Sequence, residues 1–83
     1  MLIALDYDKT YTADPDLWRD FVQLAKQRGH VVTIVTMRYF YENITDAPCD
    51  VDVIYTARKA KSSCVEADIW IDDSPQWVYQ DSL

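Results

Sequence analysis

The chain has 83 residues, of which 49% are hydrophobic and 13% aromatic, and it carries a formal net charge of −6. This length predicts one domain, residues 1–83, with enough apolar side chains for one compact core. The acidic balance argues against general nucleic-acid binding, because contact with the phosphate backbone requires Lys and Arg, but it leaves room for a small anionic substrate beside a bound metal ion.

The two cysteines, Cys49 and Cys64, lack the spacing of a zinc pair, and no His lies near either of them in the sequence. We therefore expect two reduced thiols in a cytoplasmic protein. No apolar run approaches the about 18 residues of a membrane span, and no targeting segment is recognisable. We expect no membrane partner.

The first strand is expected at residues 2–7, where a near-continuous apolar run is typical of a strand covered on both faces. A helix follows over residues 13–29. Asp14 suits its N-cap, and Gly29, the only glycine of the chain, suits the left-handed position past its end.

The remaining chain alternates strands with shorter elements. We expect strands at 30–38, 51–56 and 68–73, a short helix at 39–45, about two helical turns at 59–67, and a short helix or edge strand at 76–83. This alternation predicts a three-layer, Rossmann-like α/β fold with a parallel sheet. The working groups of such sheets lie beyond the carboxyl ends of the strands.

Polar side chains follow every predicted strand at its carboxyl end. In chain order they are Asp6 and Asp8, then Thr36 and Arg38, then Thr56, Arg58, Lys59 and Lys61, and finally Asp72 and Asp73. In a parallel sheet all of these lie at one edge, so four carboxylates converge with hydroxyl groups and cations.

Crowded carboxylates repel one another, and a hard divalent cation with oxygen ligands relieves that repulsion. Mg²⁺ is the expected cofactor, since it takes a few carboxylates together with phosphate oxygens and water. One aspartate beside such an ion can attack phosphorus, and a second can exchange protons with the leaving group and with water. Thr and Lys side chains can bind the phosphoryl oxygens.

The motifs resemble those of the haloacid dehalogenase (HAD) superfamily of phosphohydrolases. "LDYDKTYT" resembles the first motif of the family, an apolar strand followed by Asp-x-Asp-x-Thr. "VTIVT" resembles the second, a lysine at a helix start the third, and "IWIDDSP" the fourth. The four motifs follow one another in the family's order over nearly the whole chain. The resemblance implies a minimal HAD-like fold without a cap domain, and we expect the sheet order 3-2-1-4.

By this resemblance Asp6 is the nucleophile that forms an aspartyl-phosphate. Asp8 is the general acid and base, and its backbone carbonyl also reaches the metal ion. Thr36 binds the phosphoryl group. Asp73 is a direct metal ligand and Asp72 pairs with the motif lysine, with some exchange of roles between these two.

The motif lysine is expected to be Lys61, which precedes "SSCVEA" as the family lysine precedes its helix, with Lys59 as the alternative. Arg58, Lys59 and Arg38, together with Thr10 of the first motif, are expected to help bind substrate.

The chain departs from the family pattern at Lys9, where the family usually has Gly. Lys9 either steers phosphate or points to solvent. The aromatic residues near the predicted edge either stack on a base or ring of a substrate or fill the core; these are Tyr7, Tyr11, Tyr39, Phe40 and Tyr41. Trp77 either borders the site or packs against the core, and packing is favoured.

The sequence thus predicts a Mg²⁺-dependent phosphomonoester hydrolase that acts through Asp6. An alternative is a non-catalytic binding or regulatory protein on the same scaffold. A site without a cap is open, which in this family accompanies large substrates or a neighbouring subunit that covers the site. A homo-oligomer is therefore possible, and a nucleic-acid substrate is disfavoured by the net charge.

Overall fold

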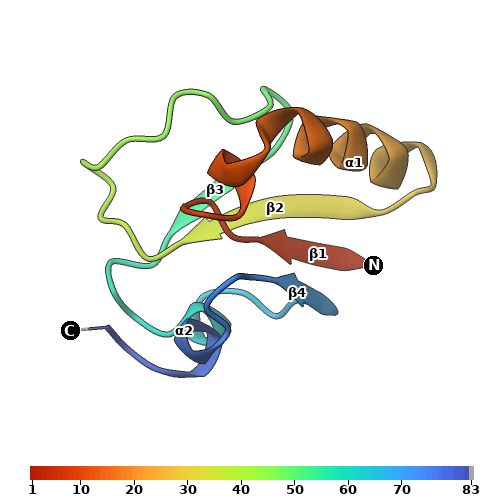
Figure 1. Ribbon diagram of the computed structural model, residues 1–83. Helices are drawn as coiled ribbons and strands as arrows, with labels where there is room; N and C mark the ends of the chain where they lie inside the picture. The colour runs from red at the N-terminus through yellow and green to blue at the C-terminus, as the bar shows by residue number, and fades with distance from the viewer. Residues whose placement is uncertain (83) are drawn as a thin grey trace.

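A four-stranded parallel sheet in the order β3-β2-β1-β4 organises the computed structural model, which describes residues 1–82 (Figure 1). The strands are β1 (Leu2–Leu5), β2 (Val31–Thr36), β3 (Val53–Tyr55) and β4 (Ile69–Ile71). β1 is central and pairs in parallel with β2 on one side and β4 on the other. The predicted α/β class and strand order are therefore confirmed.

The helix α1 (Pro15–Gln27) begins and ends as its sequence predicts. The Asp14 carboxylate accepts a hydrogen bond from the Leu17 backbone N–H at 3.3 Å, which satisfies one of the free donors of the first turn. At the other end Gly29 has φ 82°, a left-handed conformation that costs glycine little because it has no Cβ.

Apolar side chains alternate between the two faces of the sheet, so both faces are covered. Ile3 and Leu5 of β1 pack with Ile34 of β2 beneath α1, which contributes Val22 and Ala25. On the opposite face the core is smaller and is formed by Ala4, Val35 and Val65. This alternation follows from the two-residue period of a strand.

The predicted helix over residues 39–45 is wrong. Residues 37–52 contain neither helix nor strand and form a long loop between β2 and β3 (Figure 1). The Glu42 carboxylate accepts the Tyr39 N–H at 2.9 Å, and the Ile44 N–H donates to the Tyr55 hydroxyl at 2.9 Å. The Ile44 N–H, which in a helix would donate to the carbonyl of Phe40, thus donates to a side chain instead.

The two helical turns predicted over 59–67 shrink to a single 3₁₀ turn, η2 (Lys61–Ser63). The Ser63 hydroxyl donates to the Ala60 carbonyl at 2.6 Å, and Val65 then packs against the sheet. Serine competes for backbone groups in this way and is a poor helix former. Of the two alternatives for the last segment, the helix is confirmed over α2 (Gln76–Tyr79), with Leu83 outside the described residues.

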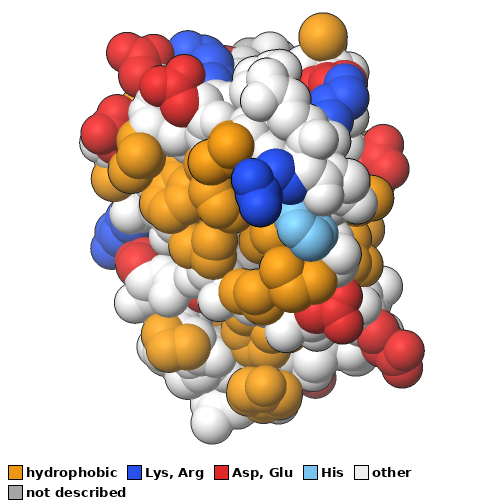
Figure 2. Space-filling view, turned by 90° about the vertical axis from the view of Figure 1, so that its right-hand side faces the viewer, with side chains coloured by type: hydrophobic (Ala, Val, Ile, Leu, Met, Phe, Trp, Pro, Cys, Tyr) orange, Lys and Arg blue, Asp and Glu red, His pale blue; other side chains and the backbone are white. Residues whose placement is uncertain are grey.

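The carboxyl ends of all four strands lie on one side of the molecule, and the amino ends lie on the other. Figure 2 views the second side, where hydrophobic side chains gather over a shallow depression between α1 and β4. Its lining includes Phe21 and Leu24 of α1 and Ile69 of β4. Among residues 1–82, no helix has the length and apolar character needed to cross a bilayer. Both cysteines are exposed free thiols.

Candidate active site

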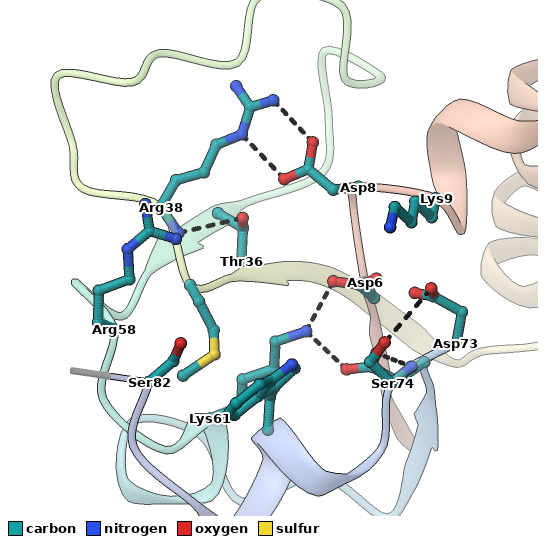
Figure 3. A pocket seen from close by; sticks show the side chains of 13 residues that line it. Asp6, Asp8, Lys9, Thr36, Arg38, Arg58, Lys61, Asp73, Ser74 and Ser82 are labelled. Carbon is teal, nitrogen blue, oxygen red and sulfur yellow. Dashed lines mark hydrogen bonds and ion pairs between the residues drawn. The ribbon is translucent and has the colours of Figure 1, made fainter.

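A pocket of about 180 Å³ lies at the carboxyl ends of the strands (Figure 3). It is reached from the ends of β1, β2 and β4, from the loop after β3, and from η2 and α2. Eight of the predicted site residues line it: Asp6, Asp8, Thr36, Arg38, Arg58, Lys61, Asp72 and Asp73. Residues separated by up to 67 positions in sequence are thus brought together as expected for a parallel sheet.

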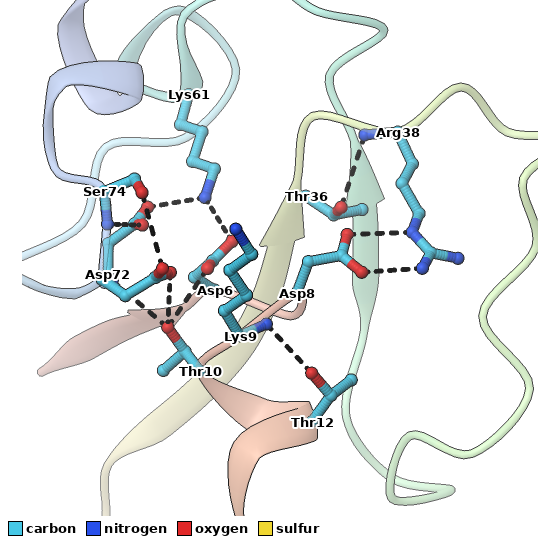
Figure 4. A network of polar contacts seen from close by, with 11 residues as sticks. Asp6, Asp8, Lys9, Thr10, Thr12, Thr36, Arg38, Lys61, Asp72 and Ser74 are labelled. Atoms are coloured by element: carbon cyan, nitrogen blue, oxygen red, sulfur yellow. Dashed lines mark hydrogen bonds and ion pairs between the residues drawn. The ribbon is translucent and has the colours of Figure 1, made fainter.

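Asp6 lies at the centre of this group and is only 9% exposed. Its carboxylate accepts a hydrogen bond from Lys61 Nζ at 2.7 Å (Figure 4). The same ammonium donates to Asp72 at 2.6 Å. Lys61, at the start of η2, is 2% exposed, so one buried cation bridges two carboxylates. The pairing of Asp72 with a lysine is as predicted, and that lysine is Lys61.

Burial raises the pKa of Asp6 to about 6, because the charged carboxylate loses its hydration. The hydrogen bond and charge of Lys61 act in the opposite direction, while the neighbouring Asp73 and Asp72 raise the pKa further. The pKa of Asp73 is lowered, mainly by its hydrogen bond with Asp6. Without a bound cation, Asp6 therefore takes up a proton at a higher pH than Asp73 does.

Thr10 lies beneath these carboxylates and does not line the pocket that holds Asp6 and Asp8. Its hydroxyl is 3.1 Å from Asp6 Oδ2 and 3.0 Å from Asp73 Oδ1, and it accepts the Asp73 backbone N–H at 3.2 Å. Trp18 of α1 holds it in place by donating to its carbonyl at 2.8 Å. A hydroxyl has one proton, so Thr10 can donate to only one of the two carboxylates at a time.

One oxygen each from Asp6, Asp72 and Asp73 lies within 4.8 Å of the other two. These hard oxygen donors and the repulsion between Asp6 and Asp73 fit a divalent cation. The same donor set suits several hard cations, so the choice of Mg²⁺ stays a prediction. The Asp8 side chain is not part of this cluster, and the expected contact of its backbone carbonyl with the metal also stays a prediction.

Asp8 instead forms a two-point ion pair with Arg38, at 2.7 and 3.0 Å (Figure 3). The hydrogen bond from Arg38 to Asp8 raises the pKa of Arg38. The guanidinium also lies over the Tyr7 ring, 5.0 Å from its centroid. The Arg38 backbone N–H donates to the buried Thr36 hydroxyl at 3.3 Å. Arg38 therefore orients two of the residues predicted to act on substrate.

Lys9 is exposed and lines the pocket, so it can still either steer phosphate or point to solvent. Its φ of 67° is left-handed, a conformation that is unusual for a residue with a side chain. Lys59 is also exposed but is not among the lining residues.

Four lining residues were not predicted from the sequence to line the site: Met37, Ser74, Trp77 and Ser82. Ser74 could have been found, because it follows Asp73 in the last motif; its N–H donates to Asp72 at 2.9 Å. For Trp77 the sequence favours packing over a place at the edge of the site, but the side chain borders the pocket from α2. Ser82 reaches the pocket because its N–H donates to the Arg58 carbonyl at 2.7 Å, a long-range contact without a sequence signal.

Comparisons of the chain with protein-family models, with curated proteins and with solved structures find no match. The chemistry of the site therefore has to follow from the side chains described above.

Proposed function

We propose that the protein is a phosphomonoester hydrolase of the haloacid dehalogenase type, dependent on Mg²⁺, in which Asp6 forms an aspartyl-phosphate. The observation that carries the proposal is the group formed by Asp6, Lys61, Asp72 and Asp73. A buried carboxylate faces a pocket, a buried lysine holds it, and two further carboxylates directly follow the adjacent strand.

In the first step an oxygen of Asp6 attacks phosphorus. A bond forms between that oxygen and phosphorus, the ester P–O bond breaks, and the leaving alcohol takes a proton from Asp8. In the second step a water oxygen attacks the same phosphorus, the bond to Asp6 breaks, and Asp8 takes the water proton. Inorganic phosphate leaves and both side chains return to their starting states.

Lys61 holds the Asp6 carboxylate in place through its contact at 2.7 Å. Thr36 and Arg58 line the pocket where the phosphoryl oxygens would lie, and donors placed there stabilise the charge that develops on them. Asp6 and Asp73 are the residues proposed to hold the divalent cation, with Asp72 beside them. When bound, the cation would neutralise carboxylate and phosphoryl charge.

One observation favours the alternative, a binding or regulatory protein. Both oxygens of Asp8 are engaged by Arg38, so the residue needed for proton transfer is held by a cation. Under the hydrolase proposal, substrate binding must separate this pair. Under the alternative, the pair is a permanent part of an anion-binding surface.

A phosphatase screen separates the two. The purified protein is tested with Mg²⁺ on nucleotides, sugar phosphates, phosphopeptides and phosphorylated oligonucleotides, with and without excess chelator. We expect hydrolysis of at least one class, loss of activity in chelator, and loss in Asp6→Asn. Asp20→Asn, at an exposed position of α1, is the matched control and should keep full activity. Flat results on every class from a folded protein would favour the binding alternative, and full activity in chelator would exclude the metal.

A further inference from the structure

We infer that the loop segment Tyr39–Tyr41 is a stacking surface for the base of a nucleotide whose phosphate enters the pocket. The inference rests on the proposed function for the position of the phosphate, and it names the substrate class. It is carried by the charged groups of the pocket, by the arrangement of three aromatic rings near Arg58, and by the position of those rings outside the pocket lining.

The pocket can admit an anion once the proposed divalent cation offsets its four carboxylates, Asp6, Asp8, Asp72 and Asp73. The protein is acidic overall, yet four of its eight Lys and Arg residues line this one pocket: Lys9, Arg38, Arg58 and Lys61. Lys61 forms ion pairs with Asp6 and Asp72, and Arg38 forms an ion pair with Asp8. Within residues 1–82, Lys9 has no ion-pair partner, so a positive charge is left at the mouth.

A column of aromatic rings begins at the pocket wall. The Arg58 guanidinium lies 5.5 Å from the centroid of the Tyr39 ring. Tyr39 and Tyr41 are stacked at 5.4 Å with an angle of 2° between the ring planes, and Phe40 meets Tyr41 edge-on at 5.6 Å. Exposed rings of this kind are platforms on which nucleobases stack.

The outer rings of the column are open to solvent. Phe40 is 77% exposed and Tyr41 is 69% exposed, so neither fills the core. The base of the loop is nevertheless held: the Glu42 carboxylate accepts the Tyr39 N–H at 2.9 Å and pairs with Arg58 at 3.4 Å. A surface fixed in this way loses little conformational freedom when a ring binds to it.

The position of the rings favours a nucleotide over a phosphotyrosine peptide. In phosphotyrosine the ring is bonded directly to the phosphate oxygen, so it would lie inside the pocket. That interior is lined mainly by charged and hydroxyl side chains. The aromatic column lies outside the lining, beyond Arg58. A ligand that reaches both needs a spacer between phosphate and ring, and the ribose of a nucleotide is such a spacer.

The test compares binding of three probes to the Asp6→Asn protein, in which hydrolysis cannot deplete the ligand, by calorimetry with Mg²⁺. The probes are adenosine 5′-monophosphate, ribose 5-phosphate and phosphotyrosine. We expect the nucleotide to bind most tightly. Adding Tyr41→Ala or Phe40→Ala should weaken nucleotide binding about tenfold, or about 1.4 kcal/mol, and leave ribose 5-phosphate unchanged. Tyr79→Ala is the control, since Tyr79 is 74% exposed and outside the pocket lining.

The inference would be overturned if the nucleotide and ribose 5-phosphate bound equally tightly, or if phosphotyrosine bound more tightly than the nucleotide. It would also be overturned if neither Tyr41→Ala nor Phe40→Ala weakened nucleotide binding. If a 5′-phosphorylated oligonucleotide binds more tightly than the free nucleotide and loses the same affinity in Tyr41→Ala, that result would support a surface that stacks the terminal base of an oligonucleotide. The two proposals can be distinguished by their results. If the protein binds the nucleotide through Tyr41 but shows no phosphatase activity, the stacking surface is supported and the proposed hydrolysis is refuted.

Discussion

Replacing Asp6 by Asn should increase the stability of the metal-free protein at neutral pH, although the change removes the proposed nucleophile. Asn has nearly the shape of a protonated Asp, and its carbonyl can still accept the hydrogen bond from Lys61. What it removes is a buried negative charge close to the carboxylates of Asp72 and Asp73. Sites prepared for function often carry such a cost in stability.

The magnitude follows from the pKa of Asp6, about 6 in the folded protein against an ordinary value of 3.8. At 1.36 kcal/mol per unit, the difference corresponds to about 3 kcal/mol. The folded protein binds the Asp6 proton more tightly than the unfolded chain does. The free energy of unfolding therefore falls as pH rises from about 4 through about 6, and the full cost is present above that range.

The assay is urea unfolding of both proteins in excess chelator at several pH values from 4 to 7.5, followed by tryptophan fluorescence. We expect Asp6→Asn to be more stable than the wild type by about 3 kcal/mol at pH 7.5 and equal to it near pH 4. Added Mg²⁺ should stabilise the wild type more than the variant. Asp20→Asn, at an exposed site, should differ little from the wild type in its free energy of unfolding, and this difference should not grow between pH 4 and pH 7.5. A variant less stable than the wild type at pH 7.5, or a constant difference across the range, would refute the reasoning.

Three further substitutions test the site and the scaffold. Lys61→Met leaves the carboxylates of Asp6 and Asp72 buried without their cation, so urea unfolding should show a loss of about 3–5 kcal/mol, part of which Asp6→Asn restores in the double variant. Asp8→Asn should reduce kcat on alkyl phosphates by about 10²–10⁴-fold and much less on p-nitrophenyl phosphate, whose leaving group barely needs a proton. Steady-state kinetics on both esters measures this difference, and an equal loss of kcat on the two would contradict the role of Asp8 as general acid. Asp14→Ala removes the N-cap of α1 and should cost about 1 kcal/mol in thermal unfolding while activity is retained.

The parts of the fold that the sequence predicts are those determined by local signals. Asp14 and Gly29 mark the ends of α1 because capping and left-handed backbone depend on neighbouring residues. The apolar run of β1 and the β-branched run of β2 predict buried parallel strands. Once the strands are placed, the convergence of Asp6, Thr36 and Asp73 follows from the topology.

The parts that it does not predict depend on contacts between distant residues. The loop after β2 is shaped by Tyr55, whose hydroxyl accepts a hydrogen bond from Ile44. Arg38 pairs with Asp8 thirty residues away, a contact with no local signal. The sequence favours Lys61 over Lys59 by its place before "SSCVEA", but the burial of Lys61 depends on its contacts with Asp6 and Asp72, which are 55 and 11 residues away.

The central strand β1 joins the two ends of the described chain in one sheet, because it pairs with β4. The Leu2 N–H donates to Asp68 at a sequence separation of 66 residues, so the pairing of β4 with β1 closes a loop that spans most of the described chain. Pairings of such long range form slowly. The same pairing brings the carboxylates of Asp6 and Asp73 together, and a cation bound between them would link the last strand to the first. Hydrogen exchange at the amides of β4 should then slow when the cation is added, and these amides become a direct reporter of whether the site is assembled.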